Sequence, residues 1–286
     1  MKRLLISLAL VGLLLTAIAS LAAGAGIKTE RLSFDAEGAT EIMVNLDFSA
    51  GELRFHPADI SSVAEIEIRY DPEVNDYDAH YRVRGDRGYL DLESERRSDG
   101  DVDTEEHRWD IGLSQRYRHN LNMDLGAADI EMDLGGLSIE ELMLDVGAAS
   151  CDIDFSAPTK VRMREINIDA GASSLEMTNL GNARFDELDF SGGVGSFDLD
   201  FFGDFEGRSY VSIEVGMGTA DIVVPEGLAV RLETEGGGWF SDVDFDEDHF
   251  RQVREEVWET RDFESAEHRL VLDIEVGMGA IDIRVR

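Results

Sequence analysis

Apolar and polar residues alternate along most of this chain, and one alternating unit recurs. The unit consists of two short alternating runs joined by a step of small residues that is rich in glycine. The copies are Leu46–Leu53, Asn122–Met132, Leu144–Ile153, Ile168–Met177, Leu188–Leu199, Ile213–Ile222 and Ile274–Ile283. Period-two alternation predicts β-strands with one buried face. Recurrence at about 20–25 residues predicts a stack of similar coils.

The small-residue step decides which face of each strand is buried. From the outward acid to the next inward residue the count is six in most copies, as from Asp124 to Ile130, and eight from Asp189 to Phe197. Residues six apart would share a face in an unbroken strand, so we expect the step to shift the alternation by one residue. We also expect the step to supply a position that can take a positive φ.

The spacing of the step indicates the architecture. The glycines at 126, 147, 171, 193 and 216 lie 21, 24, 22 and 23 residues apart, which is long for a serial hairpin and fits one coil of a solenoid. We therefore predict an all-β protein with a parallel β-solenoid, resembling a single-stranded β-helix, over residues 121–286. An antiparallel β-sandwich is the alternative.

Two other regions have different patterns. Residues 26–120 alternate less regularly, and Gly85–Gly88 between two alternating runs is typical of a hairpin turn, so we predict a small antiparallel β module there. The region 246–263 breaks the repeat. Because Phe250, Val253 and Val257 have helical spacing, we expect a short helix or a long loop inserted between the last two coils.

The N-terminus is expected to direct export. Lys2 and Arg3 precede a long apolar run, and Ala23–Ala25 fits a cleavage site, so residues 1–25 are interpreted as a signal peptide. The same run is long enough to span a bilayer, which leaves a membrane anchor through residues 4–23 as the alternative. The lone cysteine, Cys151, occupies an inward position of the repeat and is expected to be a small buried residue.

Charge limits the partners that this chain can bind. The net charge is −35, from 61 acidic and 26 basic residues, which disfavours nucleic acid and anionic membrane surfaces. Stacked coils would place the acids in two rows with a spacing of about 4.8 Å. The first row is Asp124, Asp145, Asp169 and Glu214, and the second is Glu131, Asp152, Glu176 and Asp198. We expect a solvated acidic face, with bound calcium as the alternative.

Three acidic clusters have the composition of calcium loops: residues 71–78, 99–103 and 242–248. None has the EF-hand spacing, because Thr104 and Glu247 stand where that loop requires glycine. We therefore predict no metal site and no cofactor.

No catalytic residue is predicted. The six histidines lack zinc-site spacing, no Gly-x-Ser-x-Gly elbow is present, and carboxylates are too numerous for a pair to be informative. A β-helix polysaccharide lyase or hydrolase remains an alternative, and it would need a basic residue in an acidic cleft. Arg162 and Arg164 are the nearest candidates for that residue.

Two stretches of the chain resemble known bacterial families. Gly51–Leu53, Trp109–Ile111 and Leu121–Leu137 resemble the toast-rack domain. Glu214–Val230 and Glu275–Ile283 are similar to the C-terminal domain of cell-wall-active antibiotic response proteins. The resemblance implies an exported β-solenoid of the bacterial envelope, whose relatives are uncharacterised or linked to envelope-stress signalling. The stress-linked relatives carry several transmembrane helices, whereas this chain has at most one.

The expected function is therefore that of an exported, non-enzymatic envelope module that presents a rigid acidic β surface. An envelope protein or a cell-wall glycan is the expected partner, and a role in envelope-stress signalling is the alternative. Gly236–Gly238, Trp239 and Phe240 interrupt the repeat and are candidate contact residues, although the two aromatic rings would equally serve to cap the core.

Overall fold

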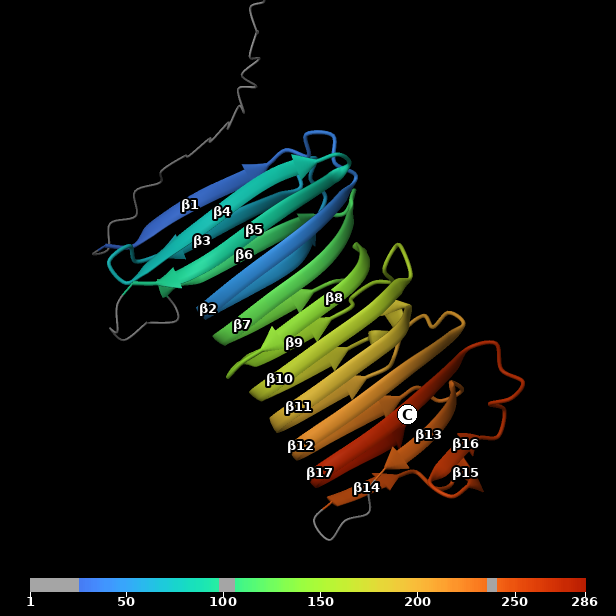
Figure 1. The fold of residues 1–286 in the computed structure, drawn as a ribbon. Coiled ribbons are helices and arrows are strands. Elements are labelled where there is room, and N and C mark those ends of the chain that lie inside the picture. The colour runs from blue at the N-terminus through green and yellow to red at the C-terminus, as the bar shows by residue number, and fades with distance from the viewer. Residues whose placement is uncertain (1–25, 98–105, 236–240) are drawn as a thin grey trace, which may run out of the picture.

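A computed structural model describes residues 26–97, 106–235 and 241–286 of the chain (Figure 1). The fold is all-β, as the alternation predicted, and the only helical element within these ranges is the short 3-10 turn η2 (Leu180–Ala183). The strands are β1 (Lys28–Phe34), β2 (Glu41–Ala58), β3 (Ala64–Tyr70), β4 (Asn75–Arg84), β5 (Arg87–Arg96), β6 (Arg108–Ser114), β7 (Arg118–Asp133), β8 (Ser138–Val146), β9 (Ser150–Asp154), β10 (Met163–Thr178), β11 (Phe185–Asp200), β12 (Arg208–Val224), β13 (Ala229–Glu235), β14 (Ser241–Phe245), β15 (Phe250–Arg254), β16 (Val257–Thr260) and β17 (Arg269–Val285).

The long strands continue through the small-residue step, so each contributes to two sheets. The halves before the step pair with one another, and so do the halves after it. Sheet I runs β4-β5-β2-β7-β8-β10-β11-β12-β17-β13-β16-β15. Sheet II runs β1-β3-β6-β2-β7-β9-β10-β11-β12-β17-β14. Pairing within the repeat is parallel, as predicted, and not the antiparallel pairing of a sandwich.

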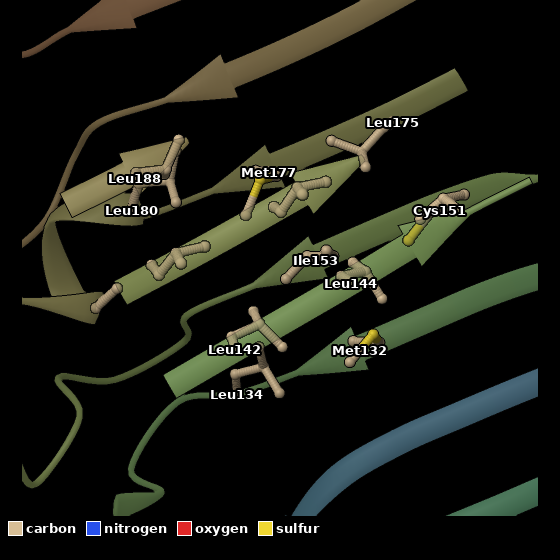
Figure 2. Packing of buried hydrophobic residues seen from close by; sticks show 14 of the residues in the cluster. Met132, Leu134, Leu142, Leu144, Cys151, Ile153, Leu175, Met177, Leu180 and Leu188 are labelled. Carbon is tan, nitrogen blue, oxygen red and sulfur yellow. The ribbon is translucent and has the colours of Figure 1, made fainter. Parts of the chain in front are cut away.

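The core lies between the inner faces of the two sheets. Each coil contributes inward residues from both sides of its step, and equivalent residues stack on one another in register. In two successive coils, Figure 2 shows Leu142, Leu144, Cys151, Ile153, Leu175 and Met177 gathered between strands of the two sheets. Cys151 is fully buried, as predicted, and burial raises the pKa of its thiol to about 12. A thiol of that kind is unreactive.

The first glycine of the step is required by close backbone approach and not by a positive φ. A Cβ at Gly171 would lie 2.9 Å from the carbonyl oxygen of Gly147, and a Cβ at Gly193 would lie 2.8 Å from that of Gly171. Positive φ angles occur instead at Gly218 and Gly279, two residues after their step glycines. The expectation that the step supplies a position with a positive φ is confirmed in these two copies, and also at Gly51 in the first copy. The shift of the alternation by one residue is confirmed, since Asp124 is exposed and Ile130 is buried.

The copy at 188–199 is not longer than the others. Strand pairing places Ser191, and not Asp189, next to Asp169, while Leu175 pairs with Phe197. The distance from outward to inward residue is therefore six in this copy too, and the apparent two-residue insertion came from matching the wrong residue. The first acidic row contains a serine at this coil.

Parallel stacking begins closer to the N-terminus than the predicted boundary at residue 121. β2 pairs in parallel with β7 along both of its halves, so Leu46–Leu53 is a full coil of the stack. The antiparallel pairs expected in the N-terminal module are present as β1–β3, β3–β6 and β4–β5, and the turn at Gly85 is confirmed. These strands extend the two sheets at the N-terminal end (Figure 1).

The C-terminal end differs from the prediction in two respects. Residues 250–260 form the β15–β16 hairpin and no helix, because Glu256 takes a left-handed conformation (φ 57°) and reverses the chain. The last strand is also not last in the stack. β17 pairs with β12 on one side and with β13 and β14 on the other, so it lies inside the stack (Figure 1).

Candidate functional site

The outer faces of both sheets carry the two acidic rows that the sequence predicted. The first acidic row lies on sheet I and consists of Asp47, Asp124, Asp145, Asp169, Glu214 and Glu275, with Ser191 between Asp169 and Glu214. The second acidic row lies on sheet II and consists of Glu131, Asp152, Glu176, Asp198, Asp221, Asp282 and Asp244. Each member neighbours the next on an adjacent strand.

Cations neutralise little of the second acidic row. Arg284 pairs with Asp221 at 2.7 Å and with Asp282 at 2.5 Å, and within the described ranges no other member of the row has an ion-pair partner. Neighbouring like charges on strands destabilise a sheet. Repulsion within the row therefore lowers the stability of the fold, and a bound cationic ligand would reduce that repulsion.

The N-terminal end of the second acidic row opens into a groove of about 710 Å³. Its wall on β2 is basic, from Arg54 and His56, while β7, β9 and β10 supply carboxylates. Arg54 is exposed and, among the described residues, has no carboxylate within ion-pair distance. His56 pairs with Asp110 at 2.9 Å, and this pair lines a second, smaller groove of about 380 Å³ beside the first.

The sequence analysis did not single out Arg54 or His56. The available signal was their place in the early copy, where Arg54 stands next to Glu131 in the register. The arginines it did single out lie elsewhere. Arg162 pairs with Asp186 at 2.5 Å and donates to the backbone carbonyl oxygen of Phe185. Arg164 pairs with Glu141 on sheet I.

Burial and neighbouring charges raise the pKa of one carboxyl in each of the predicted rows. Burial, and then the charges of Asp169 and Asp124, raise the pKa of Asp145. Burial, and then the charge of Asp221, raise the pKa of Asp198, although Arg284 opposes this shift. A carboxyl whose pKa is higher in the folded than in the unfolded state costs stability when ionised, and this cost is relieved as pH falls through the folded pKa.

We expect sodium chloride to raise the melting temperature of the protein, because salt screens repulsion within the rows. Each kcal/mol relieved corresponds to about 2–4 °C. Calcium chloride at the same ionic strength should add little beyond this rise. Melting curves in the two salts test both points, and Asp145→Asn should reduce the salt-dependent rise while Asp86→Asn, an exposed acid outside the rows, should not. A large rise specific to calcium would contradict the prediction and favour cation sites.

Two of the acidic clusters considered for calcium lie in the described ranges, and some of their acids form hydrogen bonds or ion pairs with other residues of the chain. In 71–78, Asp71 accepts the backbone N–H of Glu73 at 2.9 Å and Asp78 pairs with His80 at 2.8 Å. In 242–248, Asp246 accepts the N–H of Val285 at 3.2 Å. Across the described ranges, no cluster of three or more potential ligands is arranged to hold a metal ion. The cluster 99–103 and the residues Trp239 and Phe240 lie outside those ranges.

Two family matches cover the chain. Residues 23–178 match the N-terminal domain of toast_rack, and residues 174–283 match the C-terminal domain of the cell wall-active antibiotics response protein LiaF. No curated protein matches the chain. In the parts of the chain that are described, no helix has the length and apolar character needed to cross a membrane.

Solved structures with similar folds include a candidate cell adhesion protein from Clostridium sporogenes. It is 19% identical, the match covers 91% of this chain and 100% of that one, and the TM-score is 0.47. A candidate adhesin from Parabacteroides distasonis is 10% identical over 90% of this chain and 96% of its own, with a TM-score of 0.35. Likeness at this level does not extend to function.

Proposed function

Because this chain belongs to the toast-rack family, we propose that it is an exported, non-enzymatic envelope module that binds a cationic partner along the second acidic row. The family matches fit a protein of the envelope. In this proposal residues 1–25 are the export signal, and the stacked coils form a β-solenoid that holds the acidic surface rigid. The expected partner is an extended, lysine- or arginine-rich segment of an envelope protein.

One observation carries the proposal: seven acids occupy consecutive positions across adjacent strands, and among the described residues only Arg284 neutralises any of them. Such a row costs folding free energy, and a cationic partner relieves that cost when it binds. The carboxylates are held by paired strands, so little conformational freedom is lost when they engage a ligand.

An octalysine peptide is a direct probe of this surface. We expect it to bind the protein and to raise its melting temperature, with an affinity that falls as salt increases. The triple variant Glu131→Gln, Asp152→Asn, Glu176→Gln should weaken binding by about tenfold or more, since three charge contacts are lost. Calorimetry and thermal melting report the two quantities.

The matched control changes the same number of charges away from the rows. Asp35→Asn, Asp86→Asn and Glu255→Gln replace three exposed acids, and this variant should bind octalysine nearly as the wild type does. Equal losses in both variants would show that only the net charge matters, and the assignment to the second acidic row would then be wrong.

A second candidate function is favoured by the groove at the end of the row. It contains several carboxylates together with Arg54, which pairs with no acid among the described residues, and this is the arrangement expected of a polysaccharide lyase or hydrolase. A screen for glycan degradation tests this candidate. Product release by the wild type that is abolished by one carboxylate substitution in the groove would establish an enzyme and overturn the non-enzymatic proposal.

The match to the LiaF C-terminal domain favours a role in envelope-stress signalling as a further candidate. That role predicts a membrane-bound partner that co-purifies with a form retaining residues 1–25. Affinity capture from the native envelope, with the full chain and with a chain lacking those residues, separates this role from binding by the acidic row alone.

A further inference from the structure

Two neighbouring arginines on the outer face of sheet I have no carboxylate partner in the described parts of the chain. Arg208 and Arg269 are paired positions on β12 and β17, which places their Cα atoms about 4.8 Å apart. Among the described residues, neither guanidinium lies within ion-pair distance of an acid, although the chain has 61 acids. Like charges at adjacent positions cost stability. This pair is therefore an unexplained concentration of positive charge in an acidic protein.

A buried aromatic ring holds the two arginines in place. The guanidinium carbons of Arg208 and Arg269 lie 5.9 Å and 6.0 Å from the centre of the Phe263 ring, and that of Arg231 lies 4.5 Å from it. Arg231 is neutralised by Glu259 at 2.5 Å and lies near Glu264 at 3.5 Å. Phe263 belongs to the segment after β16 and packs with Val271 on the outside of sheet I.

Both unpaired guanidinium groups keep free hydrogen-bond donors. The Nε of Arg269 donates to the carbonyl oxygen of Ala266 at 2.8 Å, which leaves its terminal nitrogens without an acceptor in the described structure. The side chain of Arg208 donates no hydrogen bond within that structure, and its backbone carbonyl oxygen accepts one from Arg162 at 2.9 Å. Guanidinium donors form a planar fork whose geometry matches the oxygens of carboxylate and phosphate groups.

An exposed aromatic side chain lies directly beside this pair. Tyr210 is two residues after Arg208 on β12, its side chain is 48% exposed, and the Arg208 guanidinium carbon lies 4.8 Å from its ring centre. Binding sites commonly combine an aromatic surface with a few convergent polar groups. Here the ring offers an apolar contact the size of a sugar ring, next to two cations.

We propose that Arg208, Arg269 and Tyr210 bind a charged sugar, with the arginines holding its carboxylate or phosphate and the tyrosine contacting its ring. Acids more than about 10 Å from the site contribute little to the potential there, because their fields are screened at about 0.1 M salt. The site lies on the other sheet from the second acidic row and takes the opposite charge. It is therefore independent of the function proposed above.

Calorimetry with the full chain and four small probes tests the proposal. Glucuronic acid supplies the carboxylate and glucose 6-phosphate the phosphate, while glucose and inorganic phosphate supply the ring or the charge alone. We expect at least one charged sugar to bind about tenfold more tightly than glucose. Arg208→Gln and Arg269→Gln should each weaken that binding by about tenfold. Tyr210→Ala should weaken binding of the sugar and leave binding of inorganic phosphate unchanged.

Arg84→Gln is the matched control, since Arg84 is an exposed arginine on β4 and its loss changes the net charge equally. It should bind the charged sugar as the wild type does. Binding of only glucuronic acid, or of only glucose 6-phosphate, supports the proposal and identifies the recognised group.

Three results would overturn the proposal: binding of glucose as tight as that of both charged sugars, undiminished binding in the two arginine variants, or an equal loss in Arg84→Gln. If either arginine variant fails to fold, Arg208→Lys keeps the charge without the fork and Tyr210→Ala alters an exposed side chain. An unchanged affinity for the charged sugar in both of these variants would also contradict the assignment.

Discussion

Acidification from pH 7 to pH 4 should remove about 3 kcal/mol of folding stability through His119 alone. The imidazole is fully buried, its Nε2 lies 2.7 Å from the carbonyl oxygen of Ser114, and its Nδ1 has no partner among the described residues. Nε2 is therefore the protonated nitrogen, and a second proton would place a charge at Nδ1 in the core. Burial lowers the pKa of His119 to about 4, while the hydrogen bond to Ser114 opposes this shift.

The direction of this pH effect follows from where the protons bind. The unfolded chain protonates its histidine near pH 6.5, and the folded chain does so only near pH 4, so stability is complete above pH 6.5 and is lost between these values. His107, whose pKa burial also lowers to about 4, adds a loss of the same sign. Asp145 and Asp198 oppose both histidines, because their raised pKa values bring a gain in stability as pH falls.

His119→Gln isolates the contribution of this histidine. Glutamine can still donate to Ser114 and never ionises, so the variant should lose about 3 kcal/mol less than the wild type between pH 7 and pH 4. Denaturant unfolding across the pH range measures the difference. His80→Gln, at a side chain that is 70% exposed, is the control and should follow the wild-type profile. Parallel profiles for the wild type and His119→Gln would show that burial does not oppose protonation of His119, which would contradict the prediction.

Adding one methyl group at the glycine step should cost about 1–3 kcal/mol, because the new Cβ meets the backbone of the coil beneath it. The loss of stability should be larger where the new Cβ would lie closer to the nearest carbonyl oxygen. A Cβ would lie 3.2 Å from a carbonyl oxygen at Gly147, 2.8 Å at Gly193 and 2.7 Å at Gly277, so Gly147→Ala should cost least and Gly277→Ala most. Denaturant unfolding of the three variants gives the order.

Val194→Ala is the control for this series, since Val194 adjoins Gly193 and is 53% exposed. It should change stability by less than about 0.5 kcal/mol. Three alanine variants as stable as this control would mean that neighbouring coils can move apart at the step, and close backbone approach would not explain the glycines.

The repeat and its buried face could be predicted because each depends on residues that are close together in the sequence. Inward residues such as Leu144 and Cys151 alternate with acids, and the six-residue count locates the shift in every coil except the one at 188–199. Pairing between strands that are far apart in the sequence does not leave such a local pattern. The helical spacing of Phe250 and Val257 arose by coincidence, and only the left-handed Glu256 shows that the chain reverses there.

The acidic rows could be predicted for the same reason as the core, since a fixed register places like residues side by side. The groove could not be predicted, because it brings the second acidic row next to Arg54 and His56, and their strand was assigned to a separate module. The arginine pair was also out of reach. Arg208 and Arg269 are 61 residues apart, and Phe263 comes from a segment that the repeat does not include.

The position of β17 sets an order of events during folding. Coils built from β2 to β12 can each dock on the coil before them as the chain emerges. The coil of β13 and β14 cannot do so, because its parallel neighbour is β17, which is made last and must lie between it and β12. Strands β13 and β14 therefore remain unpaired on that side until β17 joins them. Completion of the stack is a single late step that depends on the final strand of the chain.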